Sequence, residues 1–197
     1  LVDSAWFAKG QEADYIAAYR RVQGIFKAAS SAFKFDWNVN QGTQNVNPEL
    51  CYPGDDVVDY IGMDIYDENP GNNQNAEARW NYFLTQNHGL NWHAAFAALH
   101  NKPMTYPEWA TGDHNTCADG DVFIRKMYAW VLANNVAYVG YWDSPHGYNG
   151  TIRENRCPQI SAAYKETFGS IAPGLSDATA DSPPSAPTLK ARQLLPM

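Results

Sequence analysis

Acidic, amide and aromatic residues gather where four apolar segments of this sequence end. They are Asp36, Trp37 and Asn38 near the end of the first segment, Asp64, Tyr66 and Asp67 at the end of the second, Glu108 and Trp109 near the end of the third, and Trp142 and Asp143 at the end of the fourth. If these segments are parallel strands, their carboxyl ends share the edge of the sheet where active-site loops begin. A solvated loop start would also be polar, but it would not need a tryptophan beside a carboxylate in three of the four cases. The pattern therefore predicts a functional cluster at this edge.

Glu108 is the strongest candidate for covalent chemistry. It follows an apolar run and lies between Pro107 and Trp109, a setting that would partly desolvate its carboxylate and restrict its movement. Such a carboxylate suits attack on an anomeric carbon, which leaves a glycosyl ester that water later hydrolyses. A single glutamate at a strand end is more often a loop anchor, and only the neighbours of Glu108 favour the nucleophile.

The composition favours sugar binding and argues against several other partners. Seven Trp, twelve Tyr and eight Phe supply flat ring surface on which the C–H groups of a pyranose can pack. The 14 basic and 21 acidic residues give a formal charge of −7 without any Lys/Arg-rich run, so nucleic acid is not an expected partner. No apolar stretch approaches the roughly 20 residues that span a bilayer, so no membrane segment is expected.

Other chemistries lack their sequence patterns. The histidines and cysteines show no spacing typical of metal ligands, and neither a P-loop nor GxGxxG nor GxSxG occurs, so we expect no metal and no cofactor. The three cysteines allow at most one disulfide. Cys117 and Cys157 are the favoured pair, and three free thiols are an equally weighted alternative.

The hydrophobic pattern predicts alternating helices and short strands. Apolar residues three and four positions apart predict a helix across residues 11–30. The predicted strands cover residues 33–40, 57–66, 102–110 and 136–143, and further helices are expected near 48–51, around 92–99, after Asp119 or Asp121 as the N-cap, and across 160–168. Pro107 predicts that regular pairing of the third strand ends near Glu108. This alternation predicts an α/β fold with a parallel sheet.

The chain is predicted to contain one domain and a tail. Residues 1–172 carry the predicted elements, whereas residues 173–197 are rich in Pro, Ser and Ala and are expected to be disordered. Four strand–helix repeats cannot close an eightfold barrel, which takes about 250 residues. The domain is therefore expected to be a small open sheet or part of a barrel.

Five segments resemble the second half of the catalytic barrel of glycoside hydrolase family 26, the β-mannanase type. They are SAWFAKGQEADYIAAYRRV, FDWNVN, YPGDDVVDYIGMDIYD, KPMTYPEW and VGYWD, which span about residues 4–168. The resemblance implies a partial (β/α)8 barrel made of the last four strand–helix units, strands 5 to 8. It also implies that Glu108 is the nucleophile and that Tyr66 hydrogen-bonds it. Trp142 would then form the floor of the adjacent sugar subsite, and Trp6 would be an aromatic residue of another subsite.

The sequence departs from this family in one respect. A retaining glycosidase needs a second carboxyl group as acid/base, and in the family that glutamate follows a histidine on the fourth strand. No His-Glu pair occurs in this chain, and the nearest acids, Asp3 and Glu12, do not match. We therefore expect the acid/base residue upstream, in a missing N-terminal half of the barrel.

The resulting hypothesis is a retaining, endo-acting β-glycanase similar to β-1,4-mannanases, secreted or periplasmic, that hydrolyses a plant or microbial polysaccharide. The residues expected to bind the substrate are Trp142, Trp37, Trp109, Asp36, Asn38, Asp64, Asp143 and Trp6. One alternative is a non-catalytic, carbohydrate-binding half-barrel. Another is a flavodoxin-like open sheet that binds a different ligand, which the lack of a phosphate loop disfavours.

Overall fold

The computed structural model describes most of the chain between residues 8 and 171. The described residues are 8–42, 46–67, 75–112, 117, 119–144, 151–171 and 193–194. They divide into two compact units, the first comprising Leu1–Ile65 and Asn81–Pro107 and the second Tyr66–Trp80 and Glu108–Met197.

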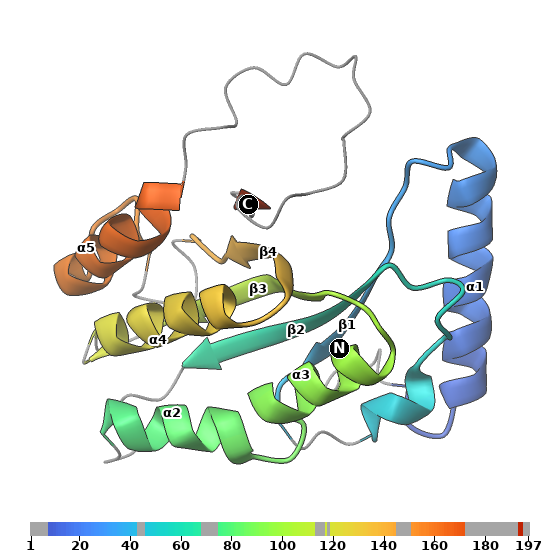
Figure 1. The fold of residues 1–197 in the computed structure, drawn as a ribbon, viewed down its shortest axis with the longest axis horizontal. Coiled ribbons are helices and arrows are strands. Elements are labelled where there is room, and N and C mark those ends of the chain that lie inside the picture. The colour runs from blue at the N-terminus through green and yellow to red at the C-terminus, as the bar shows by residue number, and fades with distance from the viewer. Residues whose placement is uncertain are drawn as a thin grey trace. The chain divides into compact units, whose positions relative to one another are not determined.

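Strands and helices alternate along the chain, as the sequence predicted (Figure 1). The strands are β1 (Asp36–Asn40), β2 (Tyr60–Asp67), β3 (Met104–Thr111), β4 (Val136–Tyr141) and β5 (Gln193–Leu194), and their order in the sheet is β1-β2-β3-β4-β5. The helices are α1 (Glu12–Ala29), α2 (Ala76–Thr85), α3 (Leu90–Leu99), α4 (Gly120–Ala133) and α5 (Pro158–Thr167), with 3-10 turns η1 (Pro48–Cys51) and η2 (Phe168–Ile171). The α/β class is confirmed.

The core of the first unit lies on one face of β1 and β2. These strands are parallel, with Asp36 opposite Tyr60 and Asn40 opposite Asp64. Side chains alternate along β2, so Ile61, Met63 and Ile65 form a fully buried row. His93 of α3 is buried there as well.

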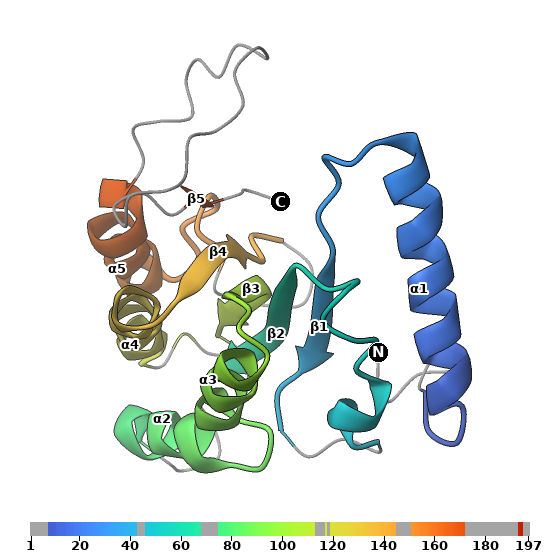
Figure 2. The same cartoon turned by 45° about the vertical axis from the view of Figure 1, so that its right-hand side comes forward.

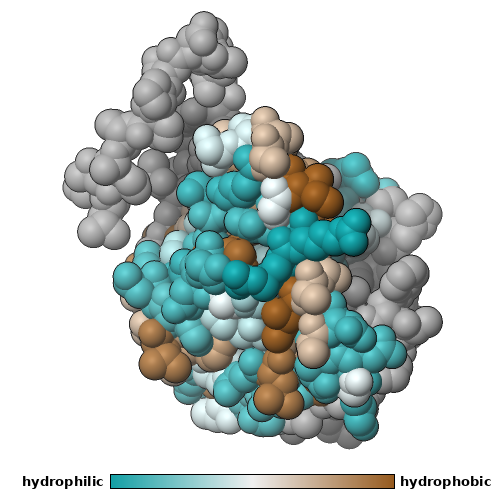
Figure 3. All heavy atoms as spheres, turned by 90° about the vertical axis from the view of Figure 1, so that its right-hand side faces the viewer, coloured by the Kyte–Doolittle hydropathy of each residue, from teal (hydrophilic) through white to brown (hydrophobic). Residues whose placement is uncertain are grey.

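The helix α1 confirms the predicted range of 11–30, but it contains no buried residue. Val22, Ile25 and Phe26 are 49%, 60% and 45% exposed. Figure 3 views the molecule from the side on which α1 lies in Figure 1, and brown apolar patches lie there among hydrophilic surface. The apolar face that the sequence predicted is therefore present. It is only partly covered, because Phe26 contacts the rings of Phe33 and Phe35 but stays 45% exposed.

The second unit packs α4 and α5 side by side (Figures 1 and 2). Gly120 permits this approach, because a Cβ atom there would lie 2.7 Å from Ile160 Cδ1 and 2.8 Å from Thr111 Oγ1. Cys117 and Cys157, which precede the two helices, form a disulfide with Cα atoms 5.4 Å apart. The favoured cysteine pairing is thus confirmed, and Cys51 is a buried free thiol.

Two expectations about elements need correction. The strand β3 continues past Glu108 to Thr111, so Pro107 does not end it. Asp119 occupies the N-cap position of α4 but makes no side-chain capping hydrogen bond. Its carboxylate instead accepts a hydrogen bond from the backbone N–H of Ala76, at the start of α2.

Part of the predicted tail contributes to the sheet. Gln193 and Leu194 of β5 pair in parallel with Tyr138 and Val139 of β4. The rest of residues 173–197 lies outside the described residues, so their disorder stays a prediction. Within the described residues, no helix combines the length and the apolar character that crossing a membrane requires.

Candidate active site

Tyr66 and Glu108 form the centre of the candidate site in the second unit. Tyr66 is the penultimate residue of β2, and Glu108 lies in the second half of β3. The Tyr66 hydroxyl donates a hydrogen bond to Glu108 Oε1. Both side chains are only partly buried, so the carboxylate is held and still accessible. The predicted proximity of these two side chains is confirmed, and their catalytic roles stay predictions.

An irregularity in β3 coincides with Glu108. Tyr106 and Trp109 are both fully buried and contact rings on helices, Tyr106 that of His93 on α3 and Trp109 that of Phe123 on α4. Helix-facing positions of a regular strand are two residues apart, whereas these are three apart. One extra residue in a strand is typical of a bulge, and bulges tolerate a proline that has no N–H to donate. The strand continues past Pro107 to Thr111.

Trp142 and Asp143 follow β4 in the same unit. The backbone N–H of Trp142 donates to the carbonyl oxygen of Trp109 at 2.9 Å, which places Trp142 directly beside β3. Its side chain is partly exposed. Asp143 Oδ1 accepts a hydrogen bond from the backbone N–H of Ile152 at 2.7 Å. This bond connects the residue after β4 to the segment that precedes α5. The contact of Asp143 with substrate stays a prediction.

Two tryptophans expected in a sugar platform belong to the core. Trp37 is 1% exposed and packs against Tyr52 and Phe96. Trp109 is 0% exposed, and its neighbours include Tyr141 and Phe168. A ring without exposed surface offers no face to a sugar. The expectation for Trp37 and Trp109 is therefore corrected, because strand alternation turns both rings toward the helices.

The first unit carries a polar group of its own on β1 and β2. Asn38 Nδ2 donates to Asp64 Oδ1 at 2.8 Å, and Thr105 Oγ1 donates to Asp36 Oδ2 at 2.5 Å. Gly62 makes room for them, because a Cβ atom there would lie 2.6 Å from Asp36 Oδ1 and 2.7 Å from Asn38 Oδ1. The structure therefore brings Asp36, Asn38 and Asp64 together on one strand face. Their role in substrate binding stays a prediction.

Buried hydroxyl groups near the site stay protonated. Burial raises the pKa of Tyr164 to about 12, and the negative charge of Asp143 adds to the effect. Burial also raises the pKa of Tyr141, although a hydrogen bond with the backbone of Thr111 opposes the shift. Both phenols are neutral at physiological pH, so neither supplies a charge to the site.

The sequence analysis missed Arg79, which supports the end of β2. Arg79 pairs with Asp67 and Asp119, both in the second unit. Burial lowers the pKa of the Arg79 guanidinium, but the hydrogen bonds of the two carboxylates outweigh burial and raise it overall. Burial acts on Asp119 as well, yet the hydrogen bond from Arg79 lowers the pKa of that carboxyl. Nothing in the spacing of these residues signals the contact, because they lie on three different elements.

Trp6 lies outside the described residues, so its place in a sugar subsite stays a prediction. In the part of the chain that the structure describes, no group of three or more His, Cys, Asp or Glu side chains is arranged to hold a metal ion.

Comparison with known proteins relates this chain to glycoside hydrolases. A search against models of known protein families found no match. Endoglucanase H of Acetivibrio thermocellus is 29% identical over 162 residues, which cover 79% of this chain and 17% of that protein. The chain resembles glycoside hydrolases. The predicted resemblance is confirmed at this level.

Solved structures show the same fold. A double mutant of the Cellulomonas fimi endo-β-1,4-mannanase matches with a TM-score of 0.53 and 22% identity, over 71% of this chain and 32% of the mannanase chain. An engineered protein matches with a TM-score of 0.53 and 18% identity, over 83% of this chain and 41% of its own. The α/β fold is thus similar to that of a mannanase. The chain spans less than half the length of each of these proteins.

Proposed function

We propose that this chain is the nucleophile-bearing part of a retaining, endo-acting β-glycanase. The hydrogen bond from Tyr66 to the partly exposed carboxylate of Glu108 is the observation that supports this most directly. A nucleophile in a displacement at carbon must keep one rotamer and stay accessible. The hydrogen bond restricts the Glu108 side chain, and its partial exposure leaves the carboxylate accessible. The endoglucanase relative is consistent with this chemistry.

Glu108 would attack the anomeric carbon and form a covalent glycosyl ester as the aglycone oxygen leaves. The Tyr66 hydroxyl would hold the carboxylate oxygen that it bonds and leave the other oxygen for the attack. Water would then hydrolyse the ester. Both steps need a second carboxyl group about 5 to 5.5 Å away to give and take the proton, and we assign this role to a glutamate outside the chain.

The missing half of a barrel would supply that glutamate. We assign the chain to strands 5 to 8 of a (β/α)8 barrel related to glycoside hydrolase family 26. Among the described residues of the first unit, β1 has a sheet neighbour only in β2, and α1 leaves part of its apolar face exposed. A preceding strand–helix unit that pairs with β1 and packs on α1 would cover both. Secretion or export to the periplasm fits a polysaccharide substrate.

The substrate class follows from the site and the relatives together. Trp142 is partly exposed and its backbone bonds β3, and we assign its ring to the floor of the sugar subsite next to the cleavage point. The names of the relatives include an endoglucanase and an endo-β-1,4-mannanase. We propose β-1,4-mannan as the substrate, with β-1,4-glucan as the competing one.

Covalent trapping tests this proposal without requiring the acid/base residue. An aryl 2-deoxy-2-fluoro-β-mannoside with a good leaving group needs little protonation, and its fluorine slows hydrolysis of the ester. We expect one sugar to be added to the peptide containing Glu108, as measured by mass spectrometry of the purified chain. Glu108→Gln should abolish labelling. Glu166→Gln is the matched control, because Glu166 is an exposed residue paired with Arg125 on the surface of α4 and α5.

The carbohydrate-binding half-barrel remains the second candidate. The partly exposed Trp142 favours it, because one ring is sufficient for weak sugar binding without catalysis. Binding of mannan oligosaccharides that depends on Trp142, together with no labelling of Glu108 under any condition, would favour this alternative over the enzyme.

A further inference from the structure

One buried arginine holds the carboxyl end of β2. Arg79, in the first turn of α2, donates to Asp67 through Nε to Oδ1 at 2.8 Å and through Nη2 to Oδ2 at 3.0 Å. The exposed fractions of the two side chains are only 4% and 2%. Two parallel bonds between a guanidinium and a carboxylate fix the orientation as well as the distance of the pair. The last residue of β2 is therefore locked to the start of α2.

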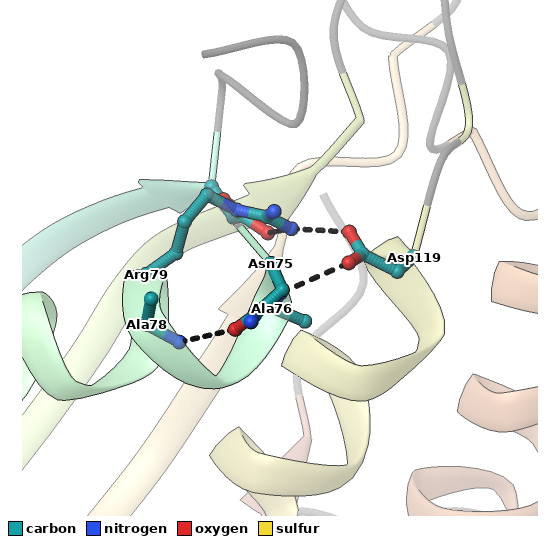
Figure 4. Close-up of polar contacts among 6 residues, drawn as sticks. Asn75, Ala76, Ala78, Arg79 and Asp119 are labelled. Atoms are coloured by element: carbon teal, nitrogen blue, oxygen red, sulfur yellow. Dashed lines mark hydrogen bonds and ion pairs between the residues drawn. The ribbon is translucent and has the colours of Figure 1, made fainter. Parts of the chain in front are cut away.

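A third element joins this pair (Figure 4). Arg79 Nη2 also donates to Asp119 Oδ1 at 2.5 Å, at the N-terminal end of α4. The other oxygen of Asp119 accepts from the Ala76 backbone N–H at 3.0 Å, and Asn75 Oδ1 accepts from the Ala78 N–H at 2.9 Å. Both contacts satisfy N–H groups that the first turn of α2 cannot pair internally. One guanidinium thus connects β2, α2 and α4.

This cluster adjoins the proposed nucleophile through the backbone. Asp67 directly follows Tyr66, so any rotation of the Asp67 backbone moves the phenol that bonds Glu108. The Asp67 carbonyl oxygen also accepts a hydrogen bond from the N–H of Gly112 at 3.2 Å, just past the end of β3. The ends of the strands that carry Tyr66 and Glu108 are therefore tied to each other and, through Asp67, to Arg79.

The cost of burying this cluster argues that it does more than stabilise the fold. A buried ion pair is weak evidence for stability, because removing charges from water offsets much of their attraction. The three bonds of Arg79 to Asp67 and Asp119 instead fix the orientation of these side chains relative to one another. A fixed orientation matters where a side chain must keep one rotamer, as Tyr66 must if it orients a nucleophile.

We propose that Arg79 is a positioning residue that acts through Asp67 to hold the Tyr66 hydroxyl on the carboxylate of Glu108. Arg79 makes no contact with substrate in this proposal. Only the kinetic consequence depends on the proposed function, whereas the coupling between Arg79 and Tyr66 can be measured in the chain without any substrate.

The first measurement is the NMR signal of the Tyr66 hydroxyl-bearing carbon in chain labelled with [ζ-13C]tyrosine. Tyr66→Phe assigns the signal by removing it, and Glu108→Gln shows where it lies when the carboxylate partner is changed. We expect Arg79→Gln to move the signal most of the way to the Glu108→Gln position. Arg125→Gln is the matched control, because Arg125 forms an exposed pair with Glu166, and it should leave the signal in place.

A paired variant keeps the experiment decisive if Arg79→Gln does not fold. That variant leaves Asp67 as a buried unpaired charge, whereas Asp67→Asn together with Arg79→Gln leaves two neutral amides in its place. We expect the paired variant to fold, as judged by circular dichroism, and to shift the Tyr66 signal. A folded variant, single or paired, with the signal at its original position would overturn the proposal.

The second measurement is the rate at which the fluoroglycoside labels Glu108. If Arg79→Gln displaces the Glu108 carboxylate, the labelling rate at saturating reagent should fall by up to about 10²-fold. The reagent concentration that gives half of this rate should not change. In a Tyr66→Phe background the same change at Arg79 should have no further effect. If the wild-type chain is not labelled but Arg79→Gln shifts the Tyr66 signal, the proposed function is rejected and the positioning role stands. Labelling at the wild-type rate in Arg79→Gln would reject the positioning role alone.

Discussion

The helices α1 and α4 have similar amphipathic patterns but different surroundings. Gly120, Phe123, Ile124, Met127 and Val131 of α4 are buried in the second unit, whereas α1 of the first unit has no buried residue. Both sequences place apolar residues three and four positions apart. The pattern therefore predicts that a helix forms and which of its faces is apolar. It does not predict how completely the rest of the chain covers that face.

The largest expected effect is the loss of a ring from α4. Phe123 is 3% exposed and contacts the rings of Trp80 and Trp109. Phe123→Ala should lower the free energy of unfolding by about 3 to 5 kcal/mol, because it removes buried surface and leaves a cavity. Urea denaturation followed by tryptophan fluorescence measures this. A loss below about 1 kcal/mol would mean that α4 is no better packed than α1.

The disulfide gives the next largest effect. It closes a loop with a sequence separation of 40 residues between the starts of α4 and α5. Replacing Cys117 and Cys157 together by serine should cost about 2 to 4 kcal/mol of unfolding free energy, since the unfolded chain gains freedom. Denaturation of both proteins under oxidising conditions measures the difference. An unchanged midpoint would show that α4 and α5 owe their packing to the core alone.

A buried histidine predicts how stability depends on pH in the first unit. His93 Nε2 donates to the carbonyl oxygen of Ile61 at 2.8 Å, and burial lowers the pKa of His93 to about 4. In the unfolded chain its pKa is near 6.5, so the unfolded state binds more protons between these two values. Stability should therefore fall as the pH drops from about 6.5 towards 4.

Measurement of unfolding free energy against pH tests this dependence. The loss attributable to His93 should reach about 2 kcal/mol at pH 5. In His93→Gln, which cannot titrate, the fall between pH 7 and pH 5 should be smaller by that amount. If the unfolding free energies of the two proteins depend on pH in the same way, His93 is hydrated and not buried as the structure shows.

The smallest effect is expected on α1. Phe26 is 45% exposed, so Phe26→Ala should change the unfolding free energy of this chain by less than about 1 kcal/mol. If a preceding barrel unit covers α1, the same substitution in the longer protein should cost about 3 kcal/mol or more. Urea denaturation of Phe26→Ala in this chain and in the longer protein measures the two costs. A large cost in the longer protein would show that α1 is packed there as α4 is, whereas a small cost in both would show that α1 is exposed in both.

The sequence alone was sufficient for the types of most elements and for marking Glu108, but it predicted neither α2 nor β5. Alternating apolar runs identified β1 to β4, and the position of Glu108 after such a run marked it as a reactive carboxylate. These features depend on local periodicity, which the chain carries in its own spacing. The proximity of Tyr66 to Glu108 was predicted through a family resemblance, because no local pattern relates residues 42 positions apart.

The tertiary structure decided which side chains face which neighbours. Trp37 and Trp109 stand beside carboxylates in the sequence, yet their rings are in the core because adjacent residues of a strand point to opposite faces. In β3, Tyr106 and Trp109 lie three residues apart and both contact rings on helices, which residue types alone do not reveal. Arg79 meets Asp67 and Asp119 only once three elements pack together. Periodicity determines the elements, whereas contacts between distant residues depend on how those elements assemble.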